Sequence, residues 1–179
     1  MLHEIRLEGS GGQGIITAGR IIGEAVSLRE HKEAIMTESY SPYVRGGSSR
    51  ADLVISDEPI DYPLVTKPDI LVAMSQEALD NNWEQTSNDA TIFVESGRVN
   101  VPSLNGRRLF TVPALKIAEE LGSKVVANIV ILGVLTAETR IVGRDAMESA
   151  IVDRYPKEAE LNRKAFAQGY KLISKGDPR

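Results

Sequence analysis

The chain has 179 residues, of which 42% are hydrophobic and 26% charged, and its formal net charge at pH 7 is -4. This composition is typical of one globular domain, and the mild acidity disfavours a dedicated nucleic-acid binder, which usually carries a basic face. The sequence has no cysteine and only two histidines, His3 and His31. It therefore excludes disulfides, a catalytic thiol, a cysteine-ligated iron–sulfur cluster and a multi-histidine metal site within the chain.

The N-terminal segment Met1 to Arg6 lacks the apolar core of a signal peptide. No apolar run along the chain approaches the roughly 20 residues of a transmembrane helix. We therefore expect a cytoplasmic protein with no membrane span, and the absence of cysteine fits a reducing compartment.

The first third of the chain alternates short strands with one helix. A strand with alternating apolar residues is followed at once by a glycine-rich turn and by a segment with a helical apolar face. The predicted segments are a strand over 2–7, the glycine turn over 9–14, a helix over 15–26, a strand over 33–36, a long ordered loop over 37–49 and a strand over 51–56.

The remainder continues the alternation and ends in helices. Ser75 is a predicted N-cap and Pro113 a predicted first helical residue. The segments are a strand over 69–74, a helix from Ser75 toward Trp83, strands over 91–95 and 109–112, a helix over 113–121, a buried helix over 127–137 and two charged helices that break at Tyr155-Pro156. Such alternation predicts an α/β fold, a single Rossmann-like doubly wound domain over 1–179 with a largely parallel sheet and C-terminal helices.

The first candidate site is the glycine turn. Gly9, Gly11 and Gly14 fit the pattern G-x-G-x-x-G, in which the glycines permit a tight turn, close approach to a phosphate and close helix–strand packing. The following helix offers its positive end to an anion. A dinucleotide site would also need an acid at the end of the second strand, and Glu38 lies one or two residues past that place. Three readings stay open, namely a turn that binds nothing, a phosphate site and a protein contact, and they concern Gly9, Gly11, Gly12, Gln13 and Gly14.

The second candidate site is the loop that follows the second strand. It contains Tyr40, Arg45, Gly46 and Gly47. Paired glycines let the backbone approach another molecule, and an arginine can form two hydrogen bonds to a carboxylate or phosphate. In a doubly wound sheet this loop lies at the same carboxyl edge as the glycine turn. We predict a coenzyme A or partner loop, against the alternative of a surface arginine in a flexible loop.

Other polar residues give weaker signals. We expect Arg107-Arg108 to form a solvated turn, Asn128 to cap a helix, and His31 to lie on the surface. Neither histidine accompanies a nucleophile-elbow pattern, so no Ser–His–Asp arrangement is predicted. We accordingly assign no catalytic residue and no metal ligand to this chain.

Several motifs in order resemble one family, the gamma subunits of 2-oxoacid:ferredoxin (or acceptor) oxidoreductases. The glycine turn alone is a weak signal, but the similarity runs collinearly over nearly the whole chain. The Ser-Arg-Ala-Asp sequence at 49–52 favours the pyruvate, 2-oxoglutarate and branched-chain group, with the 2-oxoglutarate type preferred. The matching blocks are 9–15 with 17–19, 39–52, 68–78, 112–114, 127–133 and 161–166.

This resemblance implies one part of a heterotetrameric enzyme that oxidatively decarboxylates a 2-oxoacid to an acyl-CoA and passes electrons to ferredoxin or a similar acceptor. It implies thiamine diphosphate with Mg²⁺, iron–sulfur clusters and coenzyme A in the complex, none held by this chain alone. The implied partners are alpha, beta and delta subunits. The implied role is assembly and the approach of coenzyme A or substrate, and the isolated chain should be inactive.

Two alternatives belong to other classes of protein. One is a stand-alone NAD(P)- or FAD-dependent oxidoreductase that uses the glycine turn, against which the missing ribose acid counts. The other is a purely structural assembly domain whose glycine turn binds no ligand.

Overall fold

The computed structural model describes residues 1–40, 47–101, 103–104 and 106–175. Its centre is a six-stranded sheet with the strand order β2-β3-β1-β4-β5-β6. β1, β4, β5 and β6 are parallel, whereas β3 is antiparallel to both of its neighbours. The strands are β1 (Leu2–Ser10), β2 (Glu33–Tyr40), β3 (Ser48–Ser56), β4 (Ile70–Ala73), β5 (Thr91–Glu95) and β6 (Arg108–Val112).

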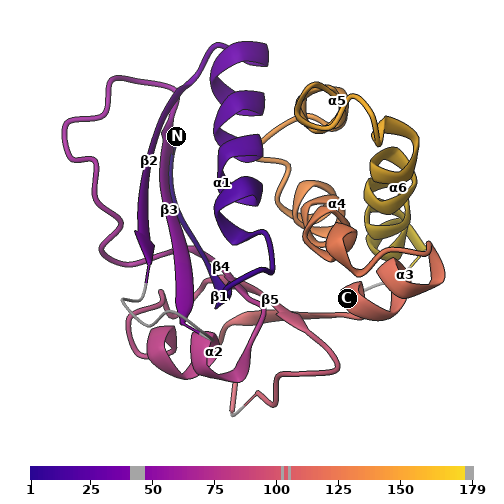
Figure 1. The fold of residues 1–179 in the computed structure, drawn as a ribbon. Helices are drawn as coiled ribbons and strands as arrows, with labels where there is room; N and C mark the ends of the chain where they lie inside the picture. The colour runs from indigo at the N-terminus through magenta and orange to yellow at the C-terminus, as the bar shows by residue number, and fades with distance from the viewer. Residues whose placement is uncertain (41–46, 102, 105, 176–179) are drawn as a thin grey trace.

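Helices cover both faces of this sheet, and most of them lie on one side (Figure 1). On the other side α2 packs beneath β1 and β4. The predicted α/β class and the C-terminal helices are therefore confirmed. The helical segments are α1 (Ile15–Glu24), the π-helix η1 (Ala25–Arg29), α2 (Gln76–Asn82), α3 (Ala114–Glu120), the 3-10 turn η2 (Lys124–Val126), α4 (Ala127–Thr139), α5 (Arg144–Arg154) and α6 (Ala159–Lys175).

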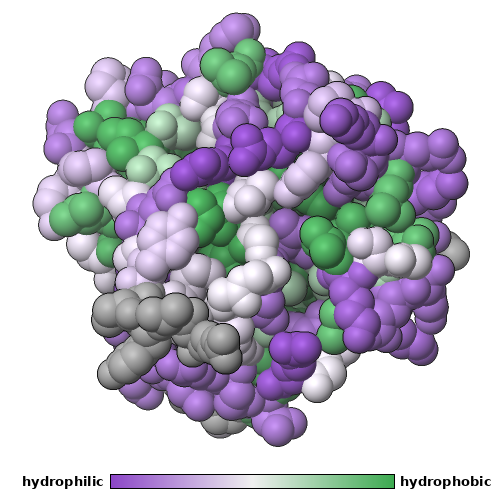
Figure 2. All heavy atoms as spheres, in the orientation of Figure 1, coloured by the Kyte–Doolittle hydropathy of each residue, from purple (hydrophilic) through white to green (hydrophobic). Residues whose placement is uncertain are grey.

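Alternation along the strands divides the core between the two faces. Ile5 and Leu7 of β1 belong to the large cluster under α1 and α4. Leu71 and Ala73 of β4 point the other way, into a smaller cluster with Leu79 of α2. Apolar side chains that do reach the surface form separate patches among polar ones on the face shown in Figure 2. Within the described residues, no helix has the length and apolarity needed to cross a bilayer.

The prediction of a long loop over 37–49 was wrong at both ends. Residues 37–40 belong to β2 and residues 48–49 to β3, and the two strands pair as an antiparallel hairpin from Glu33↔Ser56 to Tyr40↔Ser49. β2 is an edge strand whose residues are exposed or only half-buried. No apolar alternation marks it in the sequence, because backbone pairing with β3 rather than a buried face holds it in place.

Two side chains also differ from their predicted roles. Arg107 is only 7% exposed, lies 4.5 Å over the ring of Trp83 and donates to the Trp83, Thr86 and Ser87 carbonyls, so it belongs to the interior and not to a solvated turn. Arg108 is exposed as expected, but it is the first residue of β6 and donates to Glu138 and Thr91 instead of lying in a turn. Asn128 is not an N-cap, since α4 begins one residue earlier after Val126. By contrast, the predicted cap at Ser75 is confirmed, because its hydroxyl accepts from the Ala78 N–H at 3.2 Å.

α4 and α6 pack with their backbones in direct contact. A Cβ on Gly133 would overlap the Phe166 carbonyl oxygen, and a Cβ on Gly169 would overlap the Val130 carbonyl oxygen. Only glycine permits this approach at either position. The C-terminal helix is thereby fixed against α4, whose first turn reaches the carboxyl edge of the sheet.

Candidate functional site at the carboxyl edge of the sheet

The glycine turn lies at the end of β1, between that strand and α1. Gly12 and Gly14 have φ angles of 87° and 71°, in the left-handed region that favours glycine. A Cβ on Gly12 would meet open space, whereas a Cβ on Gly14 would overlap the Asn128 side-chain nitrogen. That nitrogen donates to the Gly14 carbonyl at 3.1 Å. The turn is therefore held from outside by α4.

The Gln13 side chain closes the turn from inside. The Ser10 N–H donates to Gln13 Oε1 at 2.6 Å, and Gln13 Nε2 donates to the Met74 carbonyl at 3.0 Å. Gln13 therefore joins the end of β1 to the residue that follows β4. In doubly wound sheets a ligand binds in the crevice between such strand ends. Here the side-chain amide of Gln13 spans it, which disfavours a dinucleotide bound in the Rossmann manner.

The second predicted loop meets the glycine turn at this edge. Gly11 N–H donates to the Gly47 carbonyl at 2.8 Å. Tyr40 is 65% exposed, and its hydroxyl donates to Glu38 Oε2 at 3.0 Å. Arg45 and Gly46 lie outside the described residues, so their role stays a prediction. Of the second loop, the structure thus brings Gly47 directly against the turn.

Glu38 is already committed to a neighbour. Its carboxylate accepts from Arg20 Nη2 at 2.7 Å, and this hydrogen bond from Arg20 holds the pKa of Glu38 below its ordinary value. The acid closest to the place of a ribose-binding carboxylate is therefore engaged in an ion pair with α1. This observation further disfavours the stand-alone dinucleotide enzyme.

A pocket opens beside the glycine turn, on the side of β4 and β5, and we call it the edge pocket. Its volume is about 190 Å³. Apolar walls face polar groups at the floor and rim. Its lining residues are Gly12, Gln13, Met74, Glu95, Arg98, Leu115, Lys124, Val125 and Ala127.

The floor and rim of the edge pocket carry opposite charges. Glu95 is only 2% exposed, and its carboxylate accepts from the Leu115 N–H at 3.0 Å and the Gly97 N–H at 3.3 Å, so it holds the start of α3. Arg98 and Lys124 are exposed at the rim, Lys124 with an ion pair to Glu119 at 3.0 Å. The pocket can therefore accommodate an apolar group beside an anion.

Sequence reasoning missed Glu95, Arg98 and Lys124. The signal that could have found the first two is their position at the end of β5, where Glu95 is the last strand residue and Arg98 follows it by three, because the ends of parallel strands meet at one edge of the sheet. Lys124 precedes the buried helix α4, and only the docking of that helix brings it to the same pocket.

No acid–base machinery based on histidine lies at this edge. His3, at the start of β1, contacts Asp69 with Nδ1 2.6 Å from Oδ2. His31 is exposed shortly before β2 begins. Both therefore lie toward the amino end of the sheet, opposite the glycine turn. Among the described residues there is also no group of three or more His, Asp or Glu side chains placed to hold a metal ion.

These features define a class of protein, namely a cysteine-free α/β domain that brings a glycine-rich turn and the edge pocket together at the carboxyl edge of its sheet. Residues 4–172 match the family model described as pyruvate ferredoxin/flavodoxin oxidoreductase. The chain therefore belongs to this family, as a gamma-type subunit of a 2-oxoacid:ferredoxin oxidoreductase, which confirms the resemblance seen in the sequence motifs.

Similar proteins cover nearly the whole chain. The 2-oxoglutarate synthase subunit KorC of Methanocaldococcus jannaschii is 46% identical over 96% of this chain and 94% of its own length. The gamma subunit of a keto/oxoacid ferredoxin oxidoreductase from Geobacter sulfurreducens has a TM-score of 0.86 at 36% identity, over 97% of this chain and 99% of that one. A 2-oxoglutarate:ferredoxin oxidoreductase from Magnetococcus marinus is 22% identical and has a TM-score of 0.90. The match covers 99% of this chain and 32% of that one, and it shows the shared fold.

Proposed function

We propose that this chain serves a 2-oxoglutarate:ferredoxin oxidoreductase, assembled in the cytoplasm with alpha-, beta- and delta-type subunits. Four relatives named as 2-oxoglutarate synthase subunits are 33% to 46% identical and span 94% to 98% of this chain. The common gamma subunits of pyruvate/ketoisovalerate oxidoreductases reach 28% and 30% identity over similar lengths. The preference for 2-oxoglutarate rests on the three KorC relatives that are 43% to 46% identical, since a ketoisovalerate oxidoreductase subunit VorA reaches 35% over 74% of this chain.

Within the complex, we propose that the carboxyl edge contributes to the approach of coenzyme A. The observation that carries this proposal is the edge pocket, in which an apolar wall lies next to two rim cations. Coenzyme A combines phosphates with a long, weakly polar arm, and arginine and lysine are the side chains that best bind phosphate. Because Gln13 spans the crevice between β1 and β4, the ligand would lie toward β4 and β5, on the side of Arg98 and Lys124.

The redox cofactors belong to other subunits in this proposal. Without a cysteine the chain cannot ligate an iron–sulfur cluster through thiolates. Thiamine diphosphate and the clusters would supply the decarboxylation and electron-transfer chemistry, whereas this chain would bind and orient an anionic, partly apolar ligand. The isolated chain should therefore reduce no acceptor, and measurable acceptor reduction by the pure chain would contradict the assignment.

Co-purification from the source cell followed by an acceptor-reduction assay tests the substrate and the partners. We expect alpha-, beta- and delta-type subunits to accompany the chain, and 2-oxoglutarate to be used in preference to pyruvate or a branched-chain 2-oxoacid. Titrating the isolated chain with NAD(H) tests the dinucleotide alternative, for which we expect no binding.

Two variants of the assembled enzyme test the edge pocket. Arg98→Ala with Lys124→Ala should raise the KM for coenzyme A and leave the KM for the 2-oxoacid unchanged. Lys171→Ala, which removes an exposed cation from α6, is the matched control and should change neither. If the double variant changed both KM values equally, or changed neither, the edge pocket would have no role in binding coenzyme A, and the chain would serve assembly only.

A further inference from the structure

A second hollow lies beside the edge pocket, and we call it the helix hollow. Its volume is about 330 Å³, and it is bounded by η2, the start of α4, the connection between α5 and α6, and the first turn of α6. Val125 lines the helix hollow and the edge pocket alike. This side chain is 76% exposed, more than any other large hydrophobic side chain in the described part of the chain. The two spaces are therefore neighbours on the surface and meet at one apolar side chain.

The edge pocket alone is too small to enclose coenzyme A. Pockets for small molecules usually measure about 300 to 1,000 Å³, and coenzyme A, which joins a nucleotide and several phosphates to a long arm, is among the larger ligands. The edge pocket measures about 190 Å³. A ligand whose phosphates lie at Arg98 and Lys124 therefore continues beyond this pocket. Val125 leads from it into the helix hollow, which offers the additional space.

The lining of the helix hollow fits an uncharged chain that contains amides. Val126 and Leu161 give it an apolar wall, and Tyr155 and Asn162 add a hydroxyl and an amide. Hydroxyl and amide side chains both donate and accept hydrogen bonds, so they can bind the donor and the acceptor of a neutral amide. Of the described residues that line this hollow, only Glu158 is charged, and an acid repels a phosphate.

Asn128 connects the helix hollow to the glycine turn. It lines the hollow and is only 3% exposed, and its side-chain nitrogen donates to the Gly14 carbonyl at 3.1 Å. One wall of the hollow is thus fixed to the turn that borders the edge pocket. Binding sites for small molecules are usually preformed in this way. The two spaces therefore keep their relative position and can bind two parts of one ligand.

The charges of the two spaces give that ligand a direction. Cations lie at the rim of the edge pocket, whereas the helix hollow has apolar and neutral polar walls with one acid. Coenzyme A has the matching order, since its phosphates are followed by an aliphatic arm that contains amides. We infer that this pantetheine arm crosses Val125 and lies in the helix hollow, while the phosphates lie at Arg98 and Lys124. The inference rests on the proposed function, because it takes coenzyme A as the ligand of the edge pocket.

Obstructing the helix hollow in the assembled enzyme tests this inference. Glu158→Trp places a large side chain at the hollow, and Lys157→Trp places the same side chain on the exposed neighbour that does not line it. One probe is coenzyme A, measured by its KM. The other is adenosine 3′,5′-bisphosphate, which has the nucleotide but no arm, measured by its inhibition constant.

The two probes should respond differently to the same obstruction. We expect Glu158→Trp to raise the KM for coenzyme A by about tenfold or more, and the inhibition constant of the nucleotide by less than about twofold. Lys157→Trp should change either value by less than about twofold. Both side chains are exposed, so the melting temperatures of the variant complexes should stay close to that of the wild type.

Glu158→Ala distinguishes lost space from lost charge. It removes the same carboxylate but leaves the hollow open. Because an acid beside an anionic ligand is then gone, the KM for coenzyme A should fall by up to about twofold. If Glu158→Ala raised this KM as much as Glu158→Trp does, the carboxylate rather than the space would matter, and the inference would be overturned.

The remaining outcomes separate this inference from the proposed function. Equal weakening of both probes by Glu158→Trp would place the nucleotide in the helix hollow and overturn the inference. An unchanged KM for coenzyme A in Glu158→Trp, with a raised KM in the double variant of Arg98 and Lys124, would overturn the inference and leave the proposed function standing. An unchanged KM in both would overturn the two together.

Discussion

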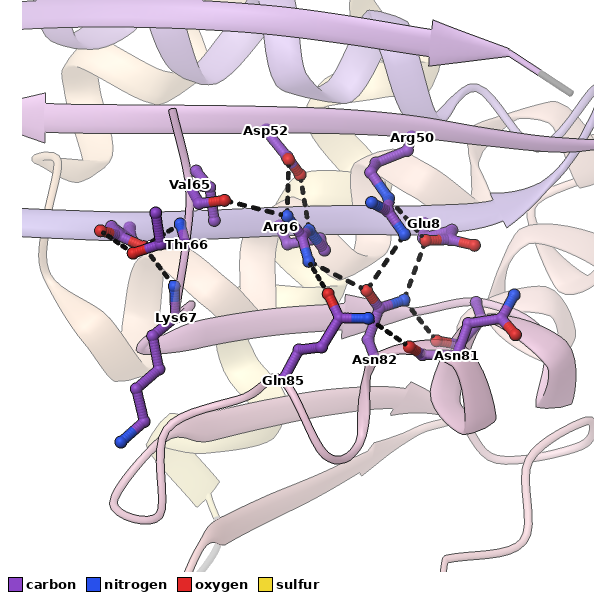
Figure 3. A network of polar contacts seen from close by, with 12 residues as sticks. Arg6, Glu8, Arg50, Asp52, Val65, Thr66, Lys67, Asn81, Asn82 and Gln85 are labelled. Carbon is purple, nitrogen blue, oxygen red and sulfur yellow. Dashed lines mark hydrogen bonds and ion pairs between the residues drawn. The ribbon is translucent and has the colours of Figure 1, made fainter. Parts of the chain in front are cut away.

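The two faces of the sheet differ in how they hold charged side chains near its carboxyl edge. On the face that α2 covers, Arg50 pairs with Glu8 at 2.8 Å, and beside them Arg6 forms two hydrogen bonds to Asp52 at 2.7 and 2.8 Å (Figure 3). In the edge pocket, Arg98 and Lys124 stay exposed at the rim. A buried pair keeps its cation inside the fold, whereas an exposed cation can still bind an anion from solution, even where it has an exposed partner as Lys124 has in Glu119. Similar residues therefore form buried ion pairs on one side of β1 and, in the proposed function, face a ligand on the other.

The register of β1 and β3 explains why the charged side chains on the α2 face form pairs. Arg6 is the cross-strand partner of Asp52, and Glu8 is the partner of Arg50. Opposite charges directly across an antiparallel pair are favourable, and a slip of either strand by one residue would move its two charges to the other face of the sheet, away from their partners. The charges of the Ser-Arg-Ala-Asp motif thus help to set the register of the sheet.

The largest expected loss of stability comes from breaking the ion pair between Arg6 and Asp52. Arg6 is buried and also donates to Asn82, Gln85 and the Val65 carbonyl. Arg6→Ala leaves the partly buried Asp52 without its cation and should lower the free energy of unfolding by about 3 to 5 kcal/mol. Urea denaturation of the isolated chain measures this value. A loss below about 1 kcal/mol would mean that the network adds little to stability.

The next largest effect compares two glycine substitutions in the turn, which distinguish the cost of backbone strain from the cost of a packing clash. Gly14→Ala meets both a positive φ and the Asn128 side chain, and should cost about 2 to 4 kcal/mol. Gly12→Ala meets only a positive φ with open space around it, and should cost about 1 to 2 kcal/mol. Denaturation of both variants under identical conditions gives the difference, and equal costs would contradict the bracing of the turn by Asn128.

Removing the exposed cations should leave the fold nearly unchanged. Arg98→Ala with Lys124→Ala should change the free energy of unfolding by no more than about 0.5 kcal/mol per site, as for ordinary surface substitutions. Thermal melting of the isolated double variant checks this expectation. A large loss of stability would show that these side chains hold the α3 side of the edge pocket together.

The smallest expected effect is the pH dependence of stability that the pair of Arg20 and Glu38 produces. The pKa of Glu38 is lowered in the folded state, first by its hydrogen bond from Arg20. A lowered folded-state pKa gives stability that is fully present above the ordinary value of 4.5 and is lost as the pH falls through the folded value. Because this pair is exposed, the loss should be small and should shrink further with salt. Comparing the pH dependence of unfolding for the wild type and Arg20→Ala below pH 5 isolates it, and identical profiles would mean that the pair contributes nothing.

Much of this protein is determined by local sequence. Apolar periodicity, the glycine turn and the cap at Ser75 specify the strands and helices, because each depends on neighbours a few residues away. Pro113, predicted as the first residue of a helix, lies one residue before α3, which begins at Ala114. The order of motifs along the chain also identifies its family. These features could be predicted without coordinates.

Only the tertiary structure decided which distant residues contact one another and which charged side chains are buried. The sequence has two adjacent arginines, yet Arg107 is buried over the ring of Trp83 and Arg108 is exposed. Gln13 reaches Met74, Asn128 reaches Gly14, and the edge pocket joins residues from 12 to 127. Each of these contacts depends on strand order, register and the docking of α4. A side-chain hydrogen bond forms only where donor and acceptor lie about 3 Å apart. For residues far apart in the chain, the tertiary structure sets that distance, so local sequence cannot predict it.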